Sequence, residues 1–350
     1  MMRVLVLANT RFSPPYLDEL AGRPGEPRAW ISEVDAELVP VDQRLLTDPP
    51  RWLRRLYARL PMRAVQVLEA HRVGRSYDAV LCWSVADVAL ALGTLLRLTH
   101  RRIRVVALLT RVSEAKKARL LRIAHPRIER IILPPAVQRE FAVRELGVPP
   151  EKLVDLPWTL DSGFWRPTAS GGPLISAAGG EMRDYRTLVR ALEGTSIPCH
   201  IAGVLDTARP DWWNASDDDR RDEQSAPSNV TFGTLTASEL RRLYDRSRFV
   251  VVPLHPTDSD NGITCMNEAW AMGRPVIVSA VAGQRDAFTH GVEGLWVPPG
   301  DPVALRAAIL TLWSDPARAA AMGAAGRARV VPARDHAVFA AGVGSVLRAV

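Results

Sequence analysis

The fold is decided by the stretch from Pro253 to Asp301, PLHPTDSDNGITCMNEAWAMGRPVIVSAVAGQRDAFTHGVEGLWVPPGD. The apolar run FVVVPL that leads into it from Phe249 predicts a strand, and a polar loop of Asp, Ser and Asn follows. The pattern ITCMNEAWAM then predicts a helix that ends at Gly273, and PVIVS predicts a second strand. Such a strand, loop, helix, strand unit is typical of a parallel sheet covered by helices.

The loop before the predicted helix has the composition of an anion site. Gly262 gives the backbone freedom to approach a ligand. The amides from Ile263 to Cys265 are expected to be unpaired donors at the positive end of the helix dipole, which favours a phosphate. Asp260 and Glu268 lie eight residues apart around this site. Carboxylates beside a phosphate site suggest hydrogen bonds from sugar hydroxyls, and the combination therefore points to a nucleotide sugar.

The runs DNGITCMNEAWAMGRPVIVS and GVEGLWVPPGDPVAL resemble the donor-binding signature of the retaining family 4 glycosyltransferases (glycosyl transferases group 1). The resemblance implies that Glu268 binds the nucleotide ribose and that Asp260 and Asn261 bind the sugar hydroxyls. The chain departs from the usual pattern in having Asp260 where the family commonly has Glu, and Gly262 where the family's glycine falls at position 263. An alternative role for Glu268 is stabilisation of the helix dipole.

The family resemblance also implies an α/β GT-B fold, in which two Rossmann-like doubly wound domains face a central cleft. Two domains agree with a length of 350 residues. The expected divisions are an acceptor-binding domain at 1–157, a hinge at 158–168, a donor-binding domain at 169–332 and a C-terminal helix at 333–350 that packs back on the first domain.

A second glycine turn is expected after the strand in PLISAAGGEMRDYRTL. Arg183 follows this turn, and the resemblance implies that it neutralises the donor diphosphate, so its loss should impair turnover more than folding. The alternative is a helix-start arginine paired with Glu181 or Asp184. We predict as catalytic Asp260, Arg183 and Glu268, and as donor-binding Gly179, Gly180, Gly233, Thr234, Leu235, Asn261, Gly262, Ile263, Thr264 and Glu268.

The composition limits the choice of partners. The three cysteines and seven histidines show no metal-ligand spacing, so we expect no bound metal and no protein-bound cofactor, with the nucleoside-diphosphate sugar as co-substrate. The net charge of +7 fits an anionic donor or an anionic membrane surface, and the scattered arginines argue against nucleic acid. The absence of a long apolar run and of a leader pattern predicts a cytoplasmic protein.

The N-terminal half is expected to be a parallel sheet, with apolar runs at 3–9, 36–40, 78–83, 103–109 and 130–133. No phosphate loop is expected there, because Ser13, Pro14 and Pro15 stand where the family commonly has glycines. In RWLRRLYARL, the residues Trp52, Leu53, Leu56, Tyr57 and Leu60 form an apolar stripe beside arginines. This helix either packs its stripe on the core or contacts an anionic membrane.

The sequence thus favours a retaining glycosyltransferase that transfers a sugar to a hydroxyl of a small-molecule acceptor. Front-face attack, in which the donor phosphate takes the acceptor proton, is implied by the resemblance. One alternative is a peripheral-membrane enzyme that acts on a lipid or cell-envelope glycan through the Trp52 helix, and another is a non-catalytic nucleotide-sugar binding protein. The acidic segment 206–229, with Trp212 and Trp213, has a loop composition and no assigned role.

Overall fold

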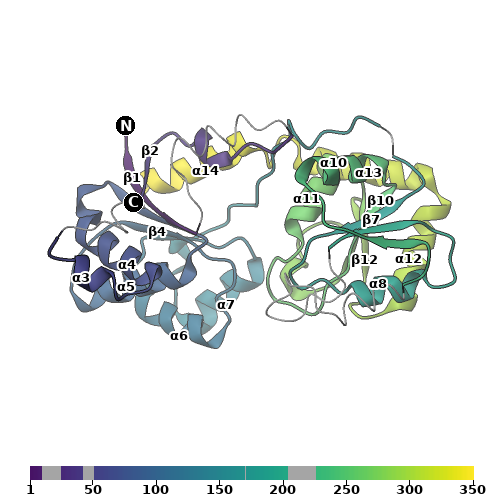
Figure 1. Cartoon of the computed structure of the whole chain (residues 1–350). Helices are drawn as coiled ribbons and strands as arrows, with labels where there is room; N and C mark the ends of the chain where they lie inside the picture. Colours follow the sequence, from purple (N-terminus) through teal and green to yellow (C-terminus); the bar gives the residue numbers. More distant parts are fainter. Residues whose placement is uncertain (10–24, 42–50, 170, 204–225) are drawn as a thin grey trace. The chain divides into compact units, whose positions relative to one another are not determined.

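A computed structural model describes residues 1–9, 25–41, 51–169, 171–203 and 226–350. The predictions for the Ser13 to Pro15 segment and for Trp212 and Trp213 lie outside these residues. The described chain separates into two compact units (Figure 1). Of the described residues, unit 1 contains 1–9, 29–157 and 339–350, and unit 2 contains 25–28 and 158–338. Among the described helices, none combines the length and the hydropathy needed to cross a bilayer.

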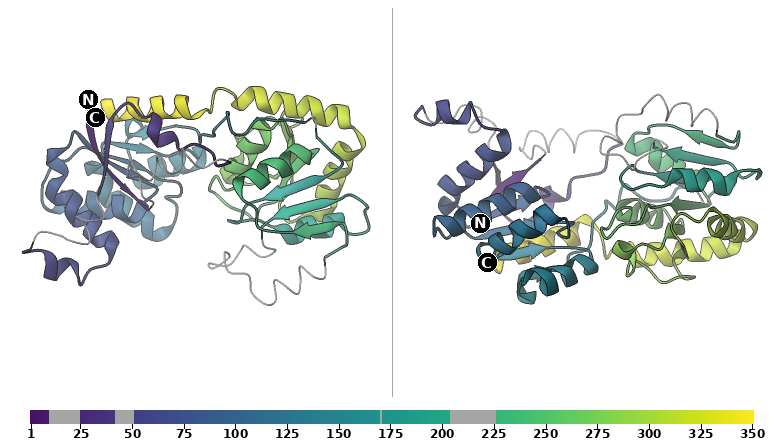
Figure 2. Two further views of the ribbon diagram at one scale, coloured as in Figure 1. Left: turned by 45° about the horizontal axis from the view of Figure 1, so that its top comes forward. Right: turned by 90° about the horizontal axis from the view of Figure 1, so that it is seen from below.

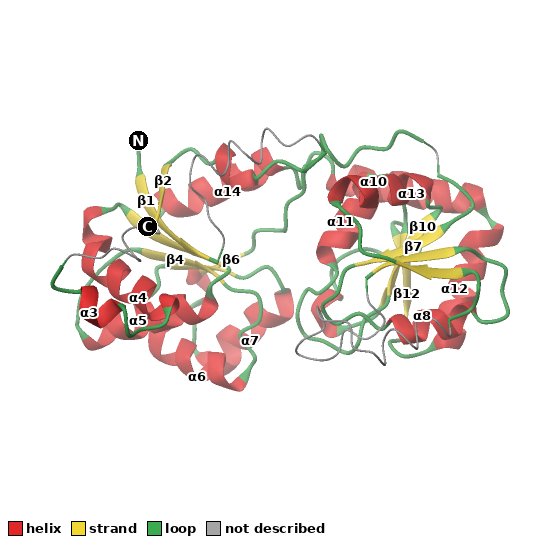
Figure 3. Cartoon of the chain, in the orientation of Figure 1, coloured by secondary structure: helices red, strands yellow, loops and turns green. Residues whose placement is uncertain are grey.

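Unit 1 is built on a parallel sheet in the order β2-β1-β3-β4-β5-β6. Its strands are β1 (Arg3–Ala8), β2 (Glu37–Pro40), β3 (Ala79–Trp83), β4 (Val105–Leu108), β5 (Arg130–Ile132) and β6 (Leu153–Val154). Its α-helices are α3 (Arg54–Tyr57), α4 (Met62–Val73), α5 (Ala86–Leu98), α6 (Ala115–Ala124) and α7 (Ala136–Leu146). Helices α4 to α7 cover one face of the sheet, and the C-terminal helix α14 (His336–Arg348) lies on the other (Figure 3).

Unit 2 is built on a second parallel sheet, in the order β12-β11-β10-β7-β8-β9. Its strands are β7 (Ile175–Ala178), β8 (Cys199–Ala202), β9 (Val230–Phe232), β10 (Phe249–Val252), β11 (Val276–Ser279) and β12 (Gly294–Val297). Its helices are α8 (Tyr185–Leu192), α10 (Ala237–Arg246), α11 (Ile263–Ala271), α12 (Pro302–Ser314) and α13 (Pro316–Val330). Figure 3 shows α8 and α12 on one face of this sheet and α10, α11 and α13 on the other.

The strand predictions are confirmed. All five apolar runs of the N-terminal half are strands of one parallel sheet, and the FVVVPL and PVIVS runs become β10 and β11, which pair in parallel. The core strands β3, β4, β10 and β11 are buried along their whole length, as strands covered on both faces must be. The expected α/β architecture is therefore present in both units.

An aromatic cluster holds α14 on unit 1. The ring of Phe339 lies edge-on to Trp30 and Trp83, with centroid separations of 5.0 and 5.8 Å, and the two indoles are 4.3 Å apart. Gly342 allows the helix to approach Leu156, because a Cβ at this position would lie 2.6 Å from the leucine Cδ1. The last turns of the chain thereby contribute to the core of unit 1.

Candidate donor site and two further pockets

Two loops of unit 2 flank the point where the strand order reverses. The chain runs outward from β7 to β8 and β9, and then returns to place β10 on the other side of β7. Ligands of doubly wound folds bind beyond the carboxyl ends of the strands at such a point. The loop after β7 carries Gly179 and Gly180, and the loop after β10 covers residues 253–262. The predicted donor residues are thus brought to one edge of one sheet.

Backbone hydrogen bonds join these two loops. Arg183 and Leu254 form an antiparallel bridge, and the His255 amide donates to the Met182 carbonyl at 2.9 Å. Met182 has a φ of 59°, which is uncommon for a residue with a side chain. The bridge holds this backbone conformation in place, so the glycine turn and the β10 loop form one continuous frame.

Helix α11 begins at the β10 loop with Gly262 as its N-cap, at a φ of 94°. A Cβ at this position would lie 2.7 Å from Val252 Cγ1, so both the space and the backbone conformation require glycine. The Ile263 amide, which was expected to be unpaired, donates to the Asp260 carbonyl at 3.1 Å. The amides of the first turn that remain for a ligand therefore begin at Thr264, which is exposed.

Arg183 lies beneath the glycine turn. Its side chain is 4% exposed, and its Nε donates to the Ala178 carbonyl at 2.9 Å. Its two terminal nitrogens donate to the Glu181 carbonyl at 2.9 Å and to Cys265 Sγ at 3.3 Å. The contact with Glu181 is therefore made to the backbone, and the guanidinium shapes the turn from below.

The Arg183 charge nevertheless lies close to both phosphate-binding candidates. A Cβ built on Gly179 would be 2.6 Å from Nη2, and one built on Gly262 would be 3.6 Å from Nη1. The absence of side chains at these two glycines brings the ligand edge near the buried cation. A charge in such a low-dielectric position acts more strongly on a neighbouring anion than an exposed one does.

Glu268 occupies the second turn of α11 and is half-buried. Its Oε2 accepts a hydrogen bond from the Tyr244 hydroxyl at 3.3 Å. Burial raises the pKa of Glu268 to about 8, while the tyrosine hydrogen bond acts in the opposite direction. A carboxyl group with this pKa changes its charge near neutrality and is well suited to respond to a ligand.

Asp260 is also partly buried, and burial raises the pKa of its carboxyl. Its Oδ2 accepts a hydrogen bond from the Trp158 indole, and its Oδ1 accepts one from the Ser259 hydroxyl at 3.2 Å. The first residue of the predicted hinge thus holds the carboxylate that was predicted to bind sugar hydroxyls.

Asn261 is fixed by its neighbours in the same loop. Its Oδ1 accepts a hydrogen bond from the Thr257 hydroxyl at 2.9 Å, and its carbonyl accepts one from Gln284 Nε2 at 2.8 Å. The backbone of Gly283 packs so closely that a Cβ there would meet the Ser259 carbonyl oxygen at 1.8 Å. The loop is therefore held in a single conformation from both sides.

The remaining predicted residues, Gly233, Thr234 and Leu235, follow β9 at the same edge of the sheet. The Gly233 amide donates to the Ile201 carbonyl at 3.1 Å, which extends the ladder between β9 and β8. The segment ends at a capping box, in which Thr236 and Glu239 bond each other's backbone amides. The three residues occupy a strand-to-helix turn one strand beyond β8.

The comparison with protein families decides the assignment of this region. Residues 185–315 match the family model of the glycosyl transferases group 1. Over these residues, which are less than half of the chain, the sequence is similar to that family. The match covers both carboxylates of the donor site and the helix α11 that carries Glu268.

Two relatives of known name align with parts of the chain. The D-rhamnosyltransferase WbpZ of Pseudomonas aeruginosa is 32% identical over 45% of this chain and 41% of its own length. The D-inositol 3-phosphate glycosyltransferase of Thermobispora bispora is 37% identical over 25% of this chain and 19% of its own length. The chain thus matches less than half the length of each relative.

Solved structures match the whole chain and show that its fold is GT-B. Anabaena Alr3699/HepE in complex with UDP-glucose aligns with a TM-score of 0.74 at 15% identity, covering 100% of both chains. Sucrose-phosphate synthase from Thermosynechococcus elongatus aligns with a TM-score of 0.71 at 20% identity, covering 100% of this chain and 99% of the other.

Unit 1 has a pocket of about 400 Å³ at the carboxyl ends of β3 and β4. The pocket is lined by apolar residues, hydroxyl groups and charged groups of both signs, among them Arg63, Ser84, Asp87, Leu108, Thr110 and Lys117. Helices α5 and α6 both begin here, and neither has a side-chain cap on its first amides. The pocket therefore offers hydroxyls, one carboxylate, two cations and two helix N-termini.

The polar wall of this pocket lies at the point where the first sheet reverses its strand order, between β1 and β3. Asn9 donates to the Ser84 carbonyl at 3.4 Å and accepts from Arg63 at 3.2 Å. Arg63 also pairs with Asp87 and, against the effect of burial, holds the pKa of that carboxyl below its usual range. Ser84 has a φ of 53°. This edge of unit 1 corresponds to the edge of unit 2 that carries the candidate donor site.

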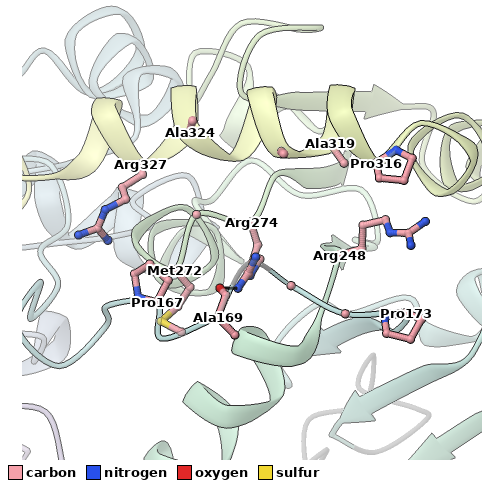
Figure 4. A pocket seen from close by; sticks show the side chains of 14 residues that line it. Pro167, Ala169, Pro173, Arg248, Met272, Arg274, Pro316, Ala319, Ala324 and Arg327 are labelled. Carbon is pink, nitrogen blue, oxygen red and sulfur yellow. Dashed lines mark hydrogen bonds between the residues drawn. The ribbon is translucent and has the colours of Figure 1, made fainter.

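A pocket of about 550 Å³ lies at the opposite edge of the second sheet, where the strands begin (Figure 4). Arg274 donates to the Tyr244 carbonyl at 2.9 Å and to the Ala169 carbonyl at 2.6 Å. Arg248 and Arg327 donate to carbonyls at the ends of α12 and α11. These guanidinium groups cap helix C-termini, so we assign the pocket a structural role.

Two contributors to the donor site carry no signal in the sequence. Tyr244 belongs to the apolar face of α10, and Trp158 lies in a connecting segment 102 residues before Asp260. From the sequence alone, an aromatic residue at either position is interpreted as a packing residue. Only the three-dimensional structure shows that both present a polar atom to a donor-site carboxylate. No group of three or more His, Cys, Asp or Glu that suits a metal ion occurs within the described residues.

Proposed function

We propose that this protein is a retaining glycosyltransferase that transfers a sugar from a nucleoside-diphosphate sugar to an acceptor hydroxyl. The proposal extends the family assignment of residues 185–315 to an activity for the whole chain. The observation that carries it is the joining of the Gly179 turn and the Gly262 helix start by the bridge between Arg183 and Leu254. These two loops meet at the strand reversal of unit 2, which is the expected place for a diphosphate.

The proposed donor contacts combine the family resemblance with the positions of these residues. The diphosphate lies against the backbone of the two glycine turns, above the buried Arg183 charge. Glu268 accepts hydrogen bonds from the ribose hydroxyls, and Asp260 with Asn261 accepts them from the sugar. Gly233, Thr234 and Leu235 contact the base through their backbone. No metal ion or protein-bound cofactor is part of the proposal, and the nucleotide sugar is the co-substrate. The complexes of HepE with UDP and UDP-glucose support this class of donor.

The proposed reaction breaks the bond between the sugar C1 and the diphosphate oxygen. The acceptor oxygen forms its bond to C1 on the same face, so the anomeric configuration is retained. The acceptor proton passes to the departing phosphate oxygen, and the products are the glycosylated acceptor and the nucleoside diphosphate. The chain's own contribution is the placement of the donor and the positive field of Arg183 and the α11 amides, which favour the charge on the leaving group.

The acceptor is proposed to bind in the pocket of unit 1. Ser84, Asp87 and Thr110 offer partners for hydroxyl groups, and Lys117 offers a positive charge. Two acceptor classes fit these groups: a small soluble molecule, and the head group of a lipid or cell-envelope glycan. The exposed surface around Trp52 favours the second class.

Thermal-shift measurements with UDP, GDP, ADP, dTDP and their sugars test the donor proposal. A ligand that binds the folded protein selectively raises its melting temperature by mass action. One nucleotide is expected to give a shift that grows with its concentration. At a pH of about 9, above the pKa of Glu268, the variant Glu268→Gln should lose most of this shift, because the amide cannot accept charge-assisted hydrogen bonds from the ribose.

The matched control is Glu239→Gln, which changes a carboxylate of the same unit in the capping box of α10. This variant should retain the nucleotide-dependent shift, although its basal melting temperature falls. Binding without transfer to any acceptor and without slow donor hydrolysis would support the non-catalytic alternative. If none of the nucleotides raises the melting temperature, the proposed donor site is contradicted.

A further inference from the structure

Three large apolar side chains in one short segment of unit 1 are exposed to solvent. Trp52 is 74% exposed, Leu56 is 49% exposed and Met62 is 43% exposed. Single exposed apolar residues are common on soluble proteins, whereas a group that includes a tryptophan marks an interaction surface. Figure 2 shows the segment around α3 at the periphery of unit 1, away from its sheet.

The apolar stripe expected from the sequence is divided in two by the structure. Leu53 and Tyr57 are buried and form a small cluster with Val65. Trp52 and Leu56 are likewise four residues apart, but they lie about 100° further round the helix and remain exposed. The packing interpretation is therefore right for one pair of residues and wrong for the other.

Arginines surround the exposed apolar residues. Arg51, Arg54, Arg55 and Arg59 are all exposed. Residues 51–68 contain five arginines and no aspartate or glutamate, so the segment carries a charge of +5 over a short distance. We call the exposed side chains of Trp52, Leu56 and Met62, together with these four arginines, the Trp52 surface.

We infer that the Trp52 surface docks on an anionic lipid bilayer. Tryptophan places its ring among lipid head groups and leucine and methionine reach the acyl boundary, while arginine pairs with lipid phosphates. Helix α3 is only four residues long and exposes three of its four side chains, so it offers no groove for a folded protein partner. Nucleic acid explains the arginines but not the exposed leucine and methionine. Charge and apolar exposure together therefore favour lipid.

The surface is continuous with the acceptor pocket proposed above. Met62 is the first residue of α4, and the next residue, Arg63, lines the pocket and pairs with Asp87. A bilayer under the Trp52 surface therefore lies next to the acceptor pocket, which suits a lipid-borne acceptor. This last step rests on the proposed function, whereas docking itself does not.

Vesicle flotation of the full chain tests the inference. The protein should float with vesicles of phosphatidylcholine mixed with phosphatidylglycerol, and much less with phosphatidylcholine alone. Raised salt should weaken the binding, because it screens the arginine charges. The variant R51Q/R54Q/R55Q/R59Q should lose on the order of 100-fold or more in vesicle affinity. The variant W52A/L56A/M62A should bind more weakly at every salt concentration.

Matched controls separate docking from general effects of charge and hydropathy. Leu98 and Val303 are 72% and 77% exposed outside the Trp52 surface, so L98A/V303A should float like the unchanged protein. The variant R102Q/R104Q removes two exposed arginines from a different segment and should lose far less affinity than the fourfold variant. Phosphatidylglycerol with brominated acyl chains should quench part of the tryptophan fluorescence of the unchanged protein. This part of the quenching should be absent in the variant Trp52→Ala.

The inference is overturned if the protein does not float, if it floats equally with neutral vesicles, or if neither surface variant changes the binding. Retention on a soluble polyanion without flotation also overturns it and indicates nucleic acid. Nucleotide-dependent thermal shifts of the surface variants should match those of the unchanged protein. If flotation fails while the nucleotide-dependent thermal shifts remain, the docking inference is wrong. If the thermal shifts are absent while flotation remains, the proposed function is wrong.

Discussion

The Tyr244 hydroxyl donates a hydrogen bond to Glu268 Oε2 at 3.3 Å, linking α10 to α11 above the second sheet. Tyr244 is fully buried, so its hydroxyl has a fixed place beside the carboxyl group of Glu268. The pKa of Glu268 is raised to about 8 by burial, so this hydrogen bond is made mostly to a protonated carboxyl near neutral pH. Donor binding at this residue should consequently depend on pH.

We expect the affinity for the nucleotide sugar to increase as the pH rises from about 6 to about 9. The folded pKa is above the usual 4.5, so Glu268 ionises only as the pH passes through about 8. The ionised carboxylate accepts stronger hydrogen bonds from ribose hydroxyls than the protonated group does. Titration calorimetry with the nucleotide sugar at several pH values measures this dependence.

Two variants check that Glu268 is the titrating group. Glu268→Gln should bind about 10- to 100-fold more weakly at alkaline pH and should lose the pH dependence in this range. Tyr244→Phe removes a hydrogen bond that lowers the pKa of Glu268, so the midpoint of the profile should move to higher pH. A flat profile for the unchanged protein would contradict the assignment.

The same shift makes a prediction for the protein without ligand. An unfolded Glu268 releases its proton near pH 4.5, whereas the folded one retains it up to about pH 8. The contribution of this residue to stability is therefore present below pH 4.5 and is lost progressively as the pH rises to about 8. Urea unfolding across this range should show that Glu268→Gln reduces the alkaline loss of stability.

Trp158→Phe should weaken binding of the nucleotide sugar but leave binding of the nucleoside diphosphate unchanged. The indole donates to Asp260, the residue proposed to bind sugar hydroxyls, and phenylalanine retains the ring without the donor. The loss of one hydrogen bond to a partly buried carboxylate should cost about 1 kcal/mol, or roughly fivefold in affinity. Comparing the two ligands in one titration series isolates the sugar contact, and an equal loss for both would remove Asp260 from the sugar site.

Gly262→Ala should abolish donor binding and destabilise unit 2. The φ of 94° and the 2.7 Å approach to Val252 Cγ1 both exclude a Cβ without movement of the α11 N-terminus. Gly291→Ala is the matched control, because its φ of 82° imposes a similar backbone strain while nothing lies within 4 Å of the added Cβ. We expect about 1 to 2 kcal/mol of destabilisation for the control, with unchanged nucleotide binding.

Arg183→Met should reduce both stability and turnover. The sequence led us to expect a larger effect on turnover, but the side chain is buried and donates to Ala178, Glu181 and Cys265. Its removal takes a charged donor away from two backbone carbonyls and from Cys265 Sγ, at a cost of about 3 kcal/mol. Arg190→Met, which changes an exposed arginine of α8, should alter the free energy of unfolding by less than about 0.5 kcal/mol. If urea unfolding shows equal stability for both variants, the structural role of Arg183 is wrong.

The sequence by itself determined the elements and the resemblance to a family. The strands, the α11 boundaries and the glycine at position 262 all follow from signals within a few residues, because hydrophobic period and turn chemistry are local properties. The donor signature is equally local, since Asp260 and Glu268 belong to one loop and the helix that follows it.

Only the tertiary structure decided what surrounds these residues. Tyr244 reaches Glu268 because α10 and α11 lie on the same face of the second sheet, and Trp158 reaches Asp260 across 102 residues of chain. Packing within unit 2 likewise buries Arg183, and packing within unit 1 leaves Trp52 exposed. Contacts of this kind depend on strand order and on which face each helix covers. The periodicity of a single segment contains neither, so a side chain's partners and burial emerge only when the whole sheet is assembled.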